Sequence, residues 1–136
     1  DLSAIGERTI WIDCDVIQAD GGTRVASITG AYVALVDAIS WLKKNAEITG
    51  EPLIGSVAAV SVGVVDGVPL LDLCYEEDVS ADVDMNIVLT GDGEYIELQG
   101  TAEKQTFSEE ELAQMIGQAK KGIRELTLIQ KDALQS

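Results

Sequence analysis

The dipeptide Asp66-Gly67 separates two apolar runs, and this feature restricts the possible folds more than any other in the sequence. The tightest hairpin turns need a positive φ angle at both central positions, which Asp and Gly adopt more readily than most residues. The runs 57–65 and 68–75 are therefore predicted to pair as an antiparallel hairpin. A chain with this hairpin must build at least part of its core on an antiparallel sheet.

A second hairpin is predicted over residues 82–90 and 94–100, with a glycine-rich turn at 91–93. Its first strand alternates between apolar and polar residues, so one face should lie against a core and the other should be open to solvent or ligand. The apolar face holds Val83, Met85, Ile87 and Leu89, and the polar face holds Asp82, Asp84 and Asn86.

Three further elements are predicted from periodicity and capping. Residues 9–18 alternate as a strand would. Residues 23–45 carry apolar and small side chains nearly all round a helix, which therefore needs partners on two sides. A C-terminal helix is predicted to start at Ser108, because Ser108 and Glu111 form a capping box and an apolar stripe follows.

These elements predict an α+β fold with the order strand, long helix, two antiparallel hairpins and C-terminal helix. A length of 136 residues allows one core, so we expect a single structural unit. Cys14 and Cys74 lie in predicted strands, and we expect two small core residues rather than a disulfide. No run approaches the ~18 uninterrupted apolar residues of a membrane span, so no membrane contact is expected.

The charge balance and the absence of histidine restrict the chemistry. Nine basic residues against 24 acidic ones give a formal charge of −15, so any contact with nucleic acid must be local. A chain without histidine cannot use a histidine-based triad or a Cys–His nucleophile. The chemistry still open to this chain uses bound phosphate, carboxylates and a divalent ion. Phosphate itself would be the nucleophile.

The segment Asp20-Gly21-Gly22-Thr23-Arg24 stands where the first predicted strand meets the long helix. Glycines let the backbone approach an anion, the helix start offers free N–H groups, and Thr23 and Arg24 add a hydroxyl and a charged fork. The segment therefore predicts a phosphate site. A plain glycine-rich turn with Arg24 in solvent explains the same residues.

Residues 76–84 contain five carboxylates, at Glu76, Glu77, Asp78, Asp82 and Asp84. Such dense like charge is costly unless a cation compensates it, so the run is a candidate site for Mg²⁺ or Mn²⁺, or for an acid with a raised pKa. A solvated acidic loop is the alternative interpretation. Asp13 and Asp15 form a further acidic pair, for which a surface position is the simpler explanation.

Two longer stretches of sequence indicate a protein family more specifically than any of these motifs. Residues 6–24 read Gly-Glu-Arg-Thr-Ile-Trp-Ile-Asp-Cys-Asp-Val-Ile-Gln-Ala-Asp-Gly-Gly-Thr-Arg, and residues 71–78 read Leu-Asp-Leu-Cys-Tyr-Glu-Glu-Asp. With Asp84-Met85-Asn86, they closely resemble the RNase PH family of phosphorolytic 3′→5′ exoribonucleases. The resemblance implies that residues 1–136 are the C-terminal part of a single RNase PH-type domain, an RNase PH-like fold lacking its N-terminal segment.

The resemblance also implies a function and a site. It implies a cytoplasmic enzyme that trims tRNA 3′ ends with inorganic phosphate and releases nucleoside diphosphates, as a ring-shaped homo-hexamer (trimer of dimers). Phosphate would be bound by Gly22, Thr23 and Arg24, and by an Arg of the missing N-terminal segment. The catalytic carboxylates would be Asp78 and Asp84, which would also hold Mg²⁺ or Mn²⁺. We favour Asp84 as the general acid and Asp78 as mainly a metal ligand.

Two other classes of protein fit some of these features. A non-catalytic structural ring subunit of an exosome-like assembly would share the fold, but it would not need Thr23, Arg24, Asp78 and Asp84 together. A plain metal-binding or folding module would bind Mg²⁺ without any dependence on phosphate. Activity on a 3′-extended tRNA with and without phosphate separates the three.

Overall fold

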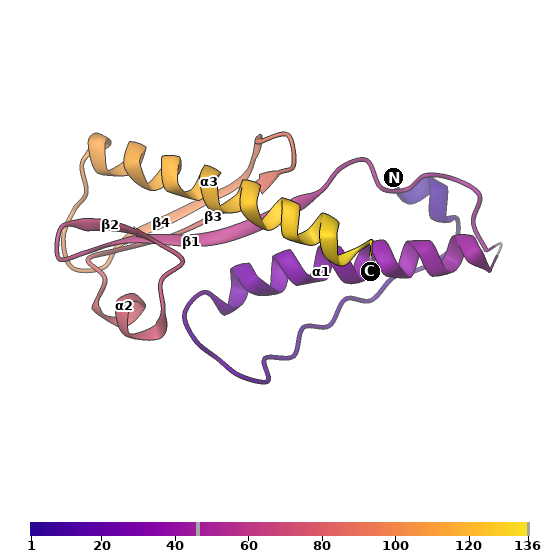
Figure 1. Cartoon of the computed structure of the whole chain (residues 1–136), viewed down its shortest axis with the longest axis horizontal. Helices are drawn as coiled ribbons and strands as arrows, with labels where there is room; N and C mark the ends of the chain where they lie inside the picture. Colours follow the sequence, from indigo (N-terminus) through magenta and orange to yellow (C-terminus); the bar gives the residue numbers. More distant parts are fainter. Residues whose placement is uncertain (46, 136) are drawn as a thin grey trace.

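The computed structural model describes residues 1–45 and 47–135. The molecule is elongated, with one four-stranded sheet, helix α3 along one face of it, and helix α1 extending beyond it (Figure 1). In chain order the elements are η1 (Leu2–Ile5), α1 (Thr23–Lys44), β1 (Val57–Val65), β2 (Val68–Leu71), α2 (Tyr75–Ser80), β3 (Val83–Thr90), β4 (Tyr95–Ala102) and α3 (Glu109–Ala133). The predicted α+β class is confirmed.

The sheet has the strand order β2-β1-β3-β4, and every neighbouring pair is antiparallel. Asp66 and Gly67 have φ angles of 50° and 75°, so the first turn has the conformation that its residues predict. Both predicted hairpins are confirmed. The strand β2 is shorter than expected, because the chain turns away at Asp72, where φ is 59°.

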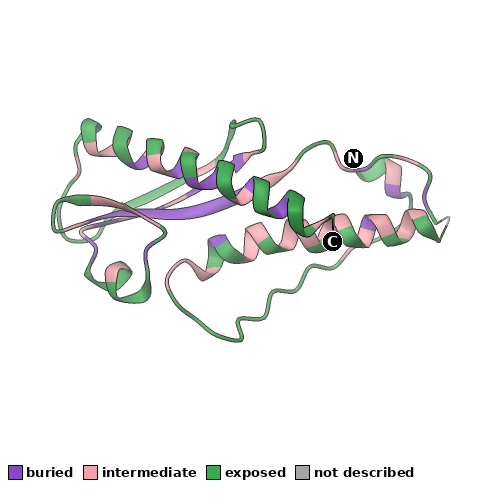
Figure 2. Ribbon diagram, viewed as in Figure 1, coloured by how far each residue is buried: buried purple, intermediate pink, exposed green. Residues whose placement is uncertain are grey.

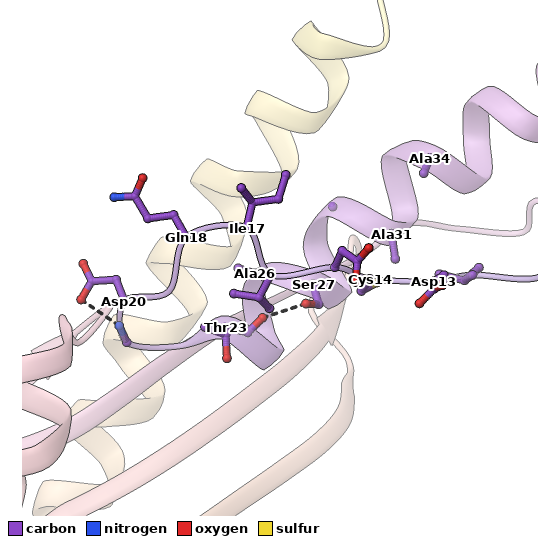
Figure 3. A pocket seen from close by; sticks show the side chains of 15 residues that line it. Asp13, Cys14, Ile17, Gln18, Asp20, Thr23, Ala26, Ser27, Ala31 and Ala34 are labelled. Atoms are coloured by element: carbon purple, nitrogen blue, oxygen red, sulfur yellow. Dashed lines mark hydrogen bonds between the residues drawn. The ribbon is translucent and has the colours of Figure 1, made fainter.

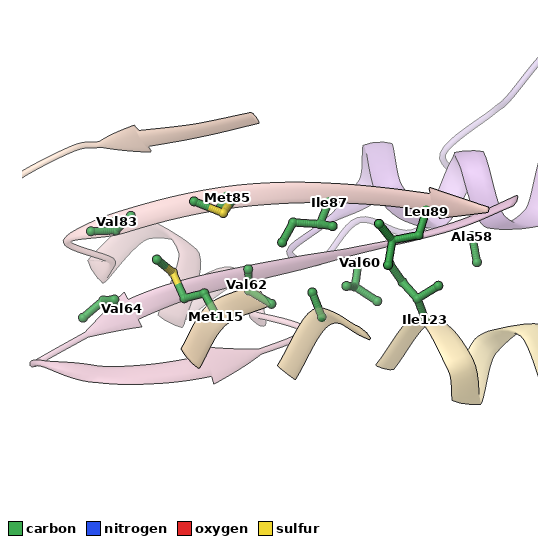
Figure 4. Close-up of a cluster of buried hydrophobic side chains, with 11 residues drawn as sticks. Ala58, Val60, Val62, Val64, Val83, Met85, Ile87, Leu89, Met115 and Ile123 are labelled. Carbon is green, nitrogen blue, oxygen red and sulfur yellow. The ribbon is translucent and has the colours of Figure 1, made fainter. Parts of the chain in front are cut away.

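The main core lies between the sheet and α3, as Figure 4 shows for the side chains of β1 and β3. Burial is concentrated on these strands and on the inner side of α3 (Figure 2). The core members are Ala58, Val60, Val62, Val64, Val83, Met85, Ile87, Leu89, Met115, Ala119 and Ile123. The predicted apolar face of β3 is confirmed, and Asp84 and Asn86 therefore project from the opposite face.

Helix α3 begins as its capping box predicts. The Ser108 hydroxyl accepts a hydrogen bond from the Glu111 backbone N–H at 3.1 Å, and the Glu111 carboxylate accepts one from the Ser108 N–H at 2.7 Å. The two bonds satisfy backbone donors that have no partner inside the helix. This local signal fixed the start of the helix correctly.

The first turns of α1 cover the other face of the sheet. Val25 is buried there against Ala59 and Val88. The Thr29 hydroxyl accepts a hydrogen bond from the Ala59 N–H at 3.0 Å. The Gln130 amide of α3 donates to the Thr29 carbonyl at 2.8 Å, so α3 also holds α1 in place. The start of α1 is therefore fixed relative to the sheet.

The second half of α1 extends past the sheet, and its residue Ile39 packs in a small separate cluster with Ile5 and Ile48. By length and composition α1 is the one helix in the described residues that could cross a membrane. A single such helix is weak evidence for a membrane span, because helices that pack in protein cores pass the same test. The contacts of Val25 and Ile39 show that α1 packs against protein at both ends.

The strand predicted over residues 9–18 is wrong. The segment is irregular and mostly exposed, and it runs beside α1 (Figure 1). Alternating side chains favour a strand only where a neighbouring strand pairs with the backbone, and the described residues place none alongside. Cys14 is consequently exposed, and so is Cys74 at the start of α2, so both expectations of burial are wrong. Both cysteines are free thiols.

Candidate active site

The phosphate loop predicted at the start of α1 has a distinctive backbone. Gly22 is the N-cap residue, with φ 69° and ψ 27°, a left-handed conformation that strongly favours glycine. A Cβ atom there would lie 3.1 Å from Val25 and 3.2 Å from the Ser61 hydroxyl. That hydroxyl is buried and has no hydrogen-bond partner among the described residues. Thr23 is the first helical residue, and Gly22 has no side chain to cap the helix N-terminus.

The same loop touches the chain just before α2. A Cβ atom at Gly21 would lie only 2.0 Å from the Leu73 carbonyl oxygen, so only glycine allows this approach. The Asp20 carboxylate accepts hydrogen bonds from the Tyr75 N–H at 2.6 Å and from the Gly21 N–H at 2.9 Å. The Tyr75 bond, followed by the Gly21 bond, lowers the pKa of Asp20.

Arg24 points toward strand β4. Its guanidinium makes two hydrogen bonds of 2.8 Å to the Glu97 carboxylate, in the paired geometry that an Arg also uses to bind phosphate. The bonds raise the pKa of Arg24 and lower that of Glu97. Arg24 is thus positioned to hold an oxyanion, and a carboxylate of the same chain occupies it.

The first part of the acidic run is a helix and not the loop of the alternative interpretation, because residues Tyr75–Ser80 form the short and mostly exposed helix α2. Asp78 lies on this helix, and Asp84 is half-buried on β3. Burial raises the pKa of the Asp84 carboxyl, and the negative charges of Asp78 and Glu103 raise it further. The predicted pair of carboxylates is therefore close enough for one charge to act on the other.

Arg24 of the predicted phosphate site and Asp84 of the predicted acidic site lie on one face of the sheet. Val88 packs under α1 and pairs across the sheet with Glu97, the partner of Arg24. Asp84 is four residues from Val88 on the same strand, so its side chain projects from the same face. At about 3.3 Å per residue, their Cα atoms are about 13 Å apart. Arg24 thus shares a face with Asp84 but is turned toward Glu97.

Two carboxylates, those of Asp78 and Asp84, would hold a magnesium ion only in part. No group of three or more His, Cys, Asp or Glu that could hold a metal is found among residues 1–45 and 47–135. Mg²⁺ commonly takes one or two carboxylates and completes its shell with water and substrate phosphate oxygens. Asp78 and Asp84 supply that number of carboxylates.

Several residues of this site were not foreseen from the sequence. Lys104 donates hydrogen bonds to the carbonyls of Val79 and Ser80 at 3.3 and 2.7 Å, and so holds the C-terminal end of α2. Asp20 holds the other end. Glu97, the partner of Arg24, is 73 residues away in sequence, and no local pattern could have predicted the pairing.

A groove of about 620 Å³ lies beside the phosphate loop, between residues 12–20 and helix α1 (Figure 3). Its lining includes the acidic residues Asp13, Asp15 and Asp20, and the small residues Ala31 and Ala34. Carboxylates repel anions, so this groove is not a second phosphate site. The candidate active site lies on the sheet side of the loop.

Two family models match the chain. The one described as 3′ exoribonuclease family, domain 1, matches residues 2–39, and the one described as domain 2 of the same family matches residues 55–122. Ribonuclease PH of Corynebacterium efficiens is 62% identical over 134 residues, which are 98% of this chain and 55% of the relative. Ribonuclease PH of Corynebacterium glutamicum (strain R) is 60% identical with the same coverage. The chain spans about half the length of these relatives.

Among solved structures, Rrp46 of rice (Oryza sativa) superposes with a TM-score of 0.71 at 20% sequence identity, covering 88% of this chain and 51% of that one. At this identity the likeness supports the fold alone. The family models cover most of the sequence, and the relatives named Ribonuclease PH are about 60% identical to it. The chain therefore belongs to the 3′ exoribonuclease family, and within it to the RNase PH proteins.

Proposed function

We propose that these residues form part of a phosphate-dependent 3′→5′ exoribonuclease that trims tRNA 3′ ends and releases nucleoside diphosphates. The relatives named Ribonuclease PH support this activity. The observation that carries the proposal is the shared face on which Gly22, Arg24 and Asp84 lie. This face offers an anion-binding helix start and a carboxyl that is easily protonated.

Inorganic phosphate binds at the start of α1 in this proposal. The free N–H groups of the first turn and the Arg24 guanidinium hold its oxygens, and Thr23 adds a hydroxyl. Arg24 is paired with the Glu97 carboxylate. Phosphate must therefore displace this carboxylate from Arg24, or share the guanidinium with it. The left-handed Gly22 allows the backbone to approach the anion without a side chain in the way.

The reaction transfers the terminal nucleotide to the bound phosphate. A phosphate oxygen attacks the phosphorus of the last linkage, and the bond from that phosphorus to the 3′ oxygen of the preceding nucleotide breaks. Asp84, whose pKa is raised, donates its proton to that leaving oxygen. The products are a nucleoside diphosphate and an RNA shortened by one nucleotide with a free 3′ hydroxyl.

Asp78 is proposed to be the main ligand of Mg²⁺ or Mn²⁺, and Asp84 to reach the ion only through the oxygen that carries no proton. The charge of the ion would offset repulsion between phosphate and the RNA backbone. Asp78 acts mainly as a ligand. The single-stranded RNA end needs only a local site, which is compatible with a formal charge of −15.

The rest of the active protein is also part of the proposal. Trp11, Ile12, Val16 and Ile17 are exposed along the segment beside α1. We assign these apolar residues to contacts with an N-terminal part of the same domain, which would also contribute phosphate-binding arginine. A cytoplasmic homo-hexamer, a trimer of dimers, completes the proposed enzyme.

The test uses a joined enzyme, in which the 136 residues are combined with the part of Corynebacterium efficiens Ribonuclease PH that they do not match. A 3′-extended tRNA is incubated with and without inorganic phosphate and Mg²⁺, and nucleoside diphosphates are measured. Shortening that requires phosphate and yields diphosphates supports the proposal. Arg24→Ala should raise the phosphate KM by at least tenfold, because a charged fork is lost.

Other outcomes contradict the proposal. Release of monophosphates without phosphate would indicate hydrolysis. A folded, ring-forming protein that binds RNA without shortening it would indicate a structural ring subunit. An unchanged phosphate KM in Arg24→Ala would show that phosphate does not bind at the start of α1.

A further inference from the structure

We propose that Asp20 is a positioning residue that joins the phosphate loop to the acidic helix α2, so that the attacking phosphate and Asp78 keep a fixed relation. The inference rests on the proposed function, because it concerns how the two halves of that site are held together. It assigns Asp20 no contact with substrate.

The geometry of Asp20 links two segments that are far apart in sequence. One carboxylate oxygen of Asp20 accepts both the Gly21 N–H, in the phosphate loop, and the Tyr75 N–H, 55 residues further on. Tyr75 is the first residue of α2, whose first N–H groups have no partner within the helix. Asp20 therefore supplies an acceptor to the helix from outside it.

The backbone on either side reinforces this link. Gly21 approaches the Leu73 carbonyl so closely that a methyl group could not fit between them. Leu73 is 1% exposed, and the neighbouring Asp72 N–H donates to the Ser61 carbonyl of β1 at 2.8 Å. The loop thus rests on a part of the chain that is itself anchored to the sheet.

Helix α2 depends on contacts of this kind because it is only six residues long. A helix of that length is not stable by itself in water. Asp20 holds its first residue, and Lys104 holds the carbonyls of Val79 and Ser80 at its end. Asp78 lies between these two anchors, so its position relative to the phosphate loop is set through Asp20.

The test compares Asp20→Ala and Asp20→Asn in the joined enzyme, with Asp92→Asn as the control. Asp92 is an exposed aspartate in the turn between β3 and β4, outside α2 and the phosphate loop. We measure kcat, the KM for inorganic phosphate, and the melting temperature of each variant. Asn keeps an acceptor oxygen for the Tyr75 N–H, whereas Ala removes it.

Asp20→Ala is expected to lower kcat roughly tenfold to a hundredfold, because a misplacement of about 1 Å between reacting groups can cost about a hundredfold in rate. The phosphate KM should change less than threefold, because Gly22, Thr23 and Arg24 remain. Asp20→Asn should recover a large part of kcat. A role confined to stability would lower the melting temperature and leave kcat at the value of the Asp92→Asn control.

The inference is overturned if kcat in Asp20→Ala equals that of the control, or if Asn gives no recovery over Ala. Should Asp20→Ala fail to fold, Tyr75→Pro removes the same hydrogen bond from the donor side, because proline has no N–H and is tolerated at the first position of a helix. A kcat below the control then supports the inference, and a kcat equal to the control refutes it. Arg24→Ala separates this result from the proposed function. If Arg24→Ala changes the phosphate KM and Asp20 variants leave kcat unchanged, only the role of Asp20 is wrong.

Discussion

The contact between Gly21 and Leu73 gives the sharpest test of how the phosphate loop is held. Replacing Gly21 by Ala would place a Cβ atom 2.0 Å from the Leu73 carbonyl oxygen and 2.9 Å from the Cys74 carbonyl carbon. Real Cβ atoms do not approach other heavy atoms within 3.0 Å, so the loop must move by at least 1 Å. The Asp20 to Tyr75 hydrogen bond of 2.6 Å spans the same gap and would lengthen.

The magnitude follows from overpacking. Forcing an extra methyl group into a fixed contact costs about 1–3 kcal/mol. For a chain of this length, that corresponds to a fall of about 3–15 °C in melting temperature. Gly30→Ala is the matched control, since Gly30 lies in α1 and an added Cβ there meets nothing within 4 Å. Alanine is favoured over glycine in a helix by up to about 1 kcal/mol, so this variant should be slightly more stable.

Thermal unfolding of the 136-residue chain, followed by circular dichroism, measures both variants. Amide hydrogen exchange at Tyr75 provides a second reading, because displacement of the loop exposes that N–H. A local shift of the loop would appear in the exchange rate even if the melting temperature moved little. The reasoning is refuted if Gly21→Ala matches Gly30→Ala in both measurements.

Two further predictions concern the charges around the site. Glu97→Gln should lower the phosphate KM of the joined enzyme about twofold to fivefold, because a surface carboxylate no longer competes for Arg24; an unchanged or higher KM would show that Glu97 does not compete. Asp84→Asn should abolish phosphorolysis and raise the melting temperature at neutral pH. The raised pKa of Asp84 means that its contribution to stability is present below the ordinary pKa of an aspartate and is lost as the pH rises through the folded-state value. The variant's advantage should therefore disappear in acid, and an advantage that persists there would contradict this assignment.

The elements that the sequence predicts correctly are those with a local signal. The Asp66-Gly67 turn, the Ser108 capping box and the alternation of β3 each depend on residues within one element. Their conformations follow from backbone preference and from which face is apolar. The fold class and the polar face that carries Asp84 could therefore be predicted.

The features that the sequence does not predict are those that depend on distant partners. Apolar and polar side chains alternate along residues 9–18 as they do in a strand. A strand also needs a neighbouring strand for its backbone hydrogen bonds. Helix α2 was missed because Cys74 is a poor capping residue, although Glu77 does accept the Cys74 N–H at 2.9 Å. The Asp20 to Tyr75 bond joins residues 55 positions apart, and no periodicity reports such a contact.

The stability of the fold does not explain why Asp84 is half-buried beside other carboxylates. Burial and the charges of Asp78 and Glu103 all oppose its ionisation, so the folded chain bears a cost at neutral pH that an asparagine would avoid. Unfavourable placements that the rest of the fold must offset are characteristic of functional sites. In the proposed reaction the cost has a direct purpose, because a carboxyl that resists ionisation keeps its proton for the leaving 3′ oxygen. Asp84→Asn should therefore lower the rate of phosphorolysis and raise the melting temperature at neutral pH.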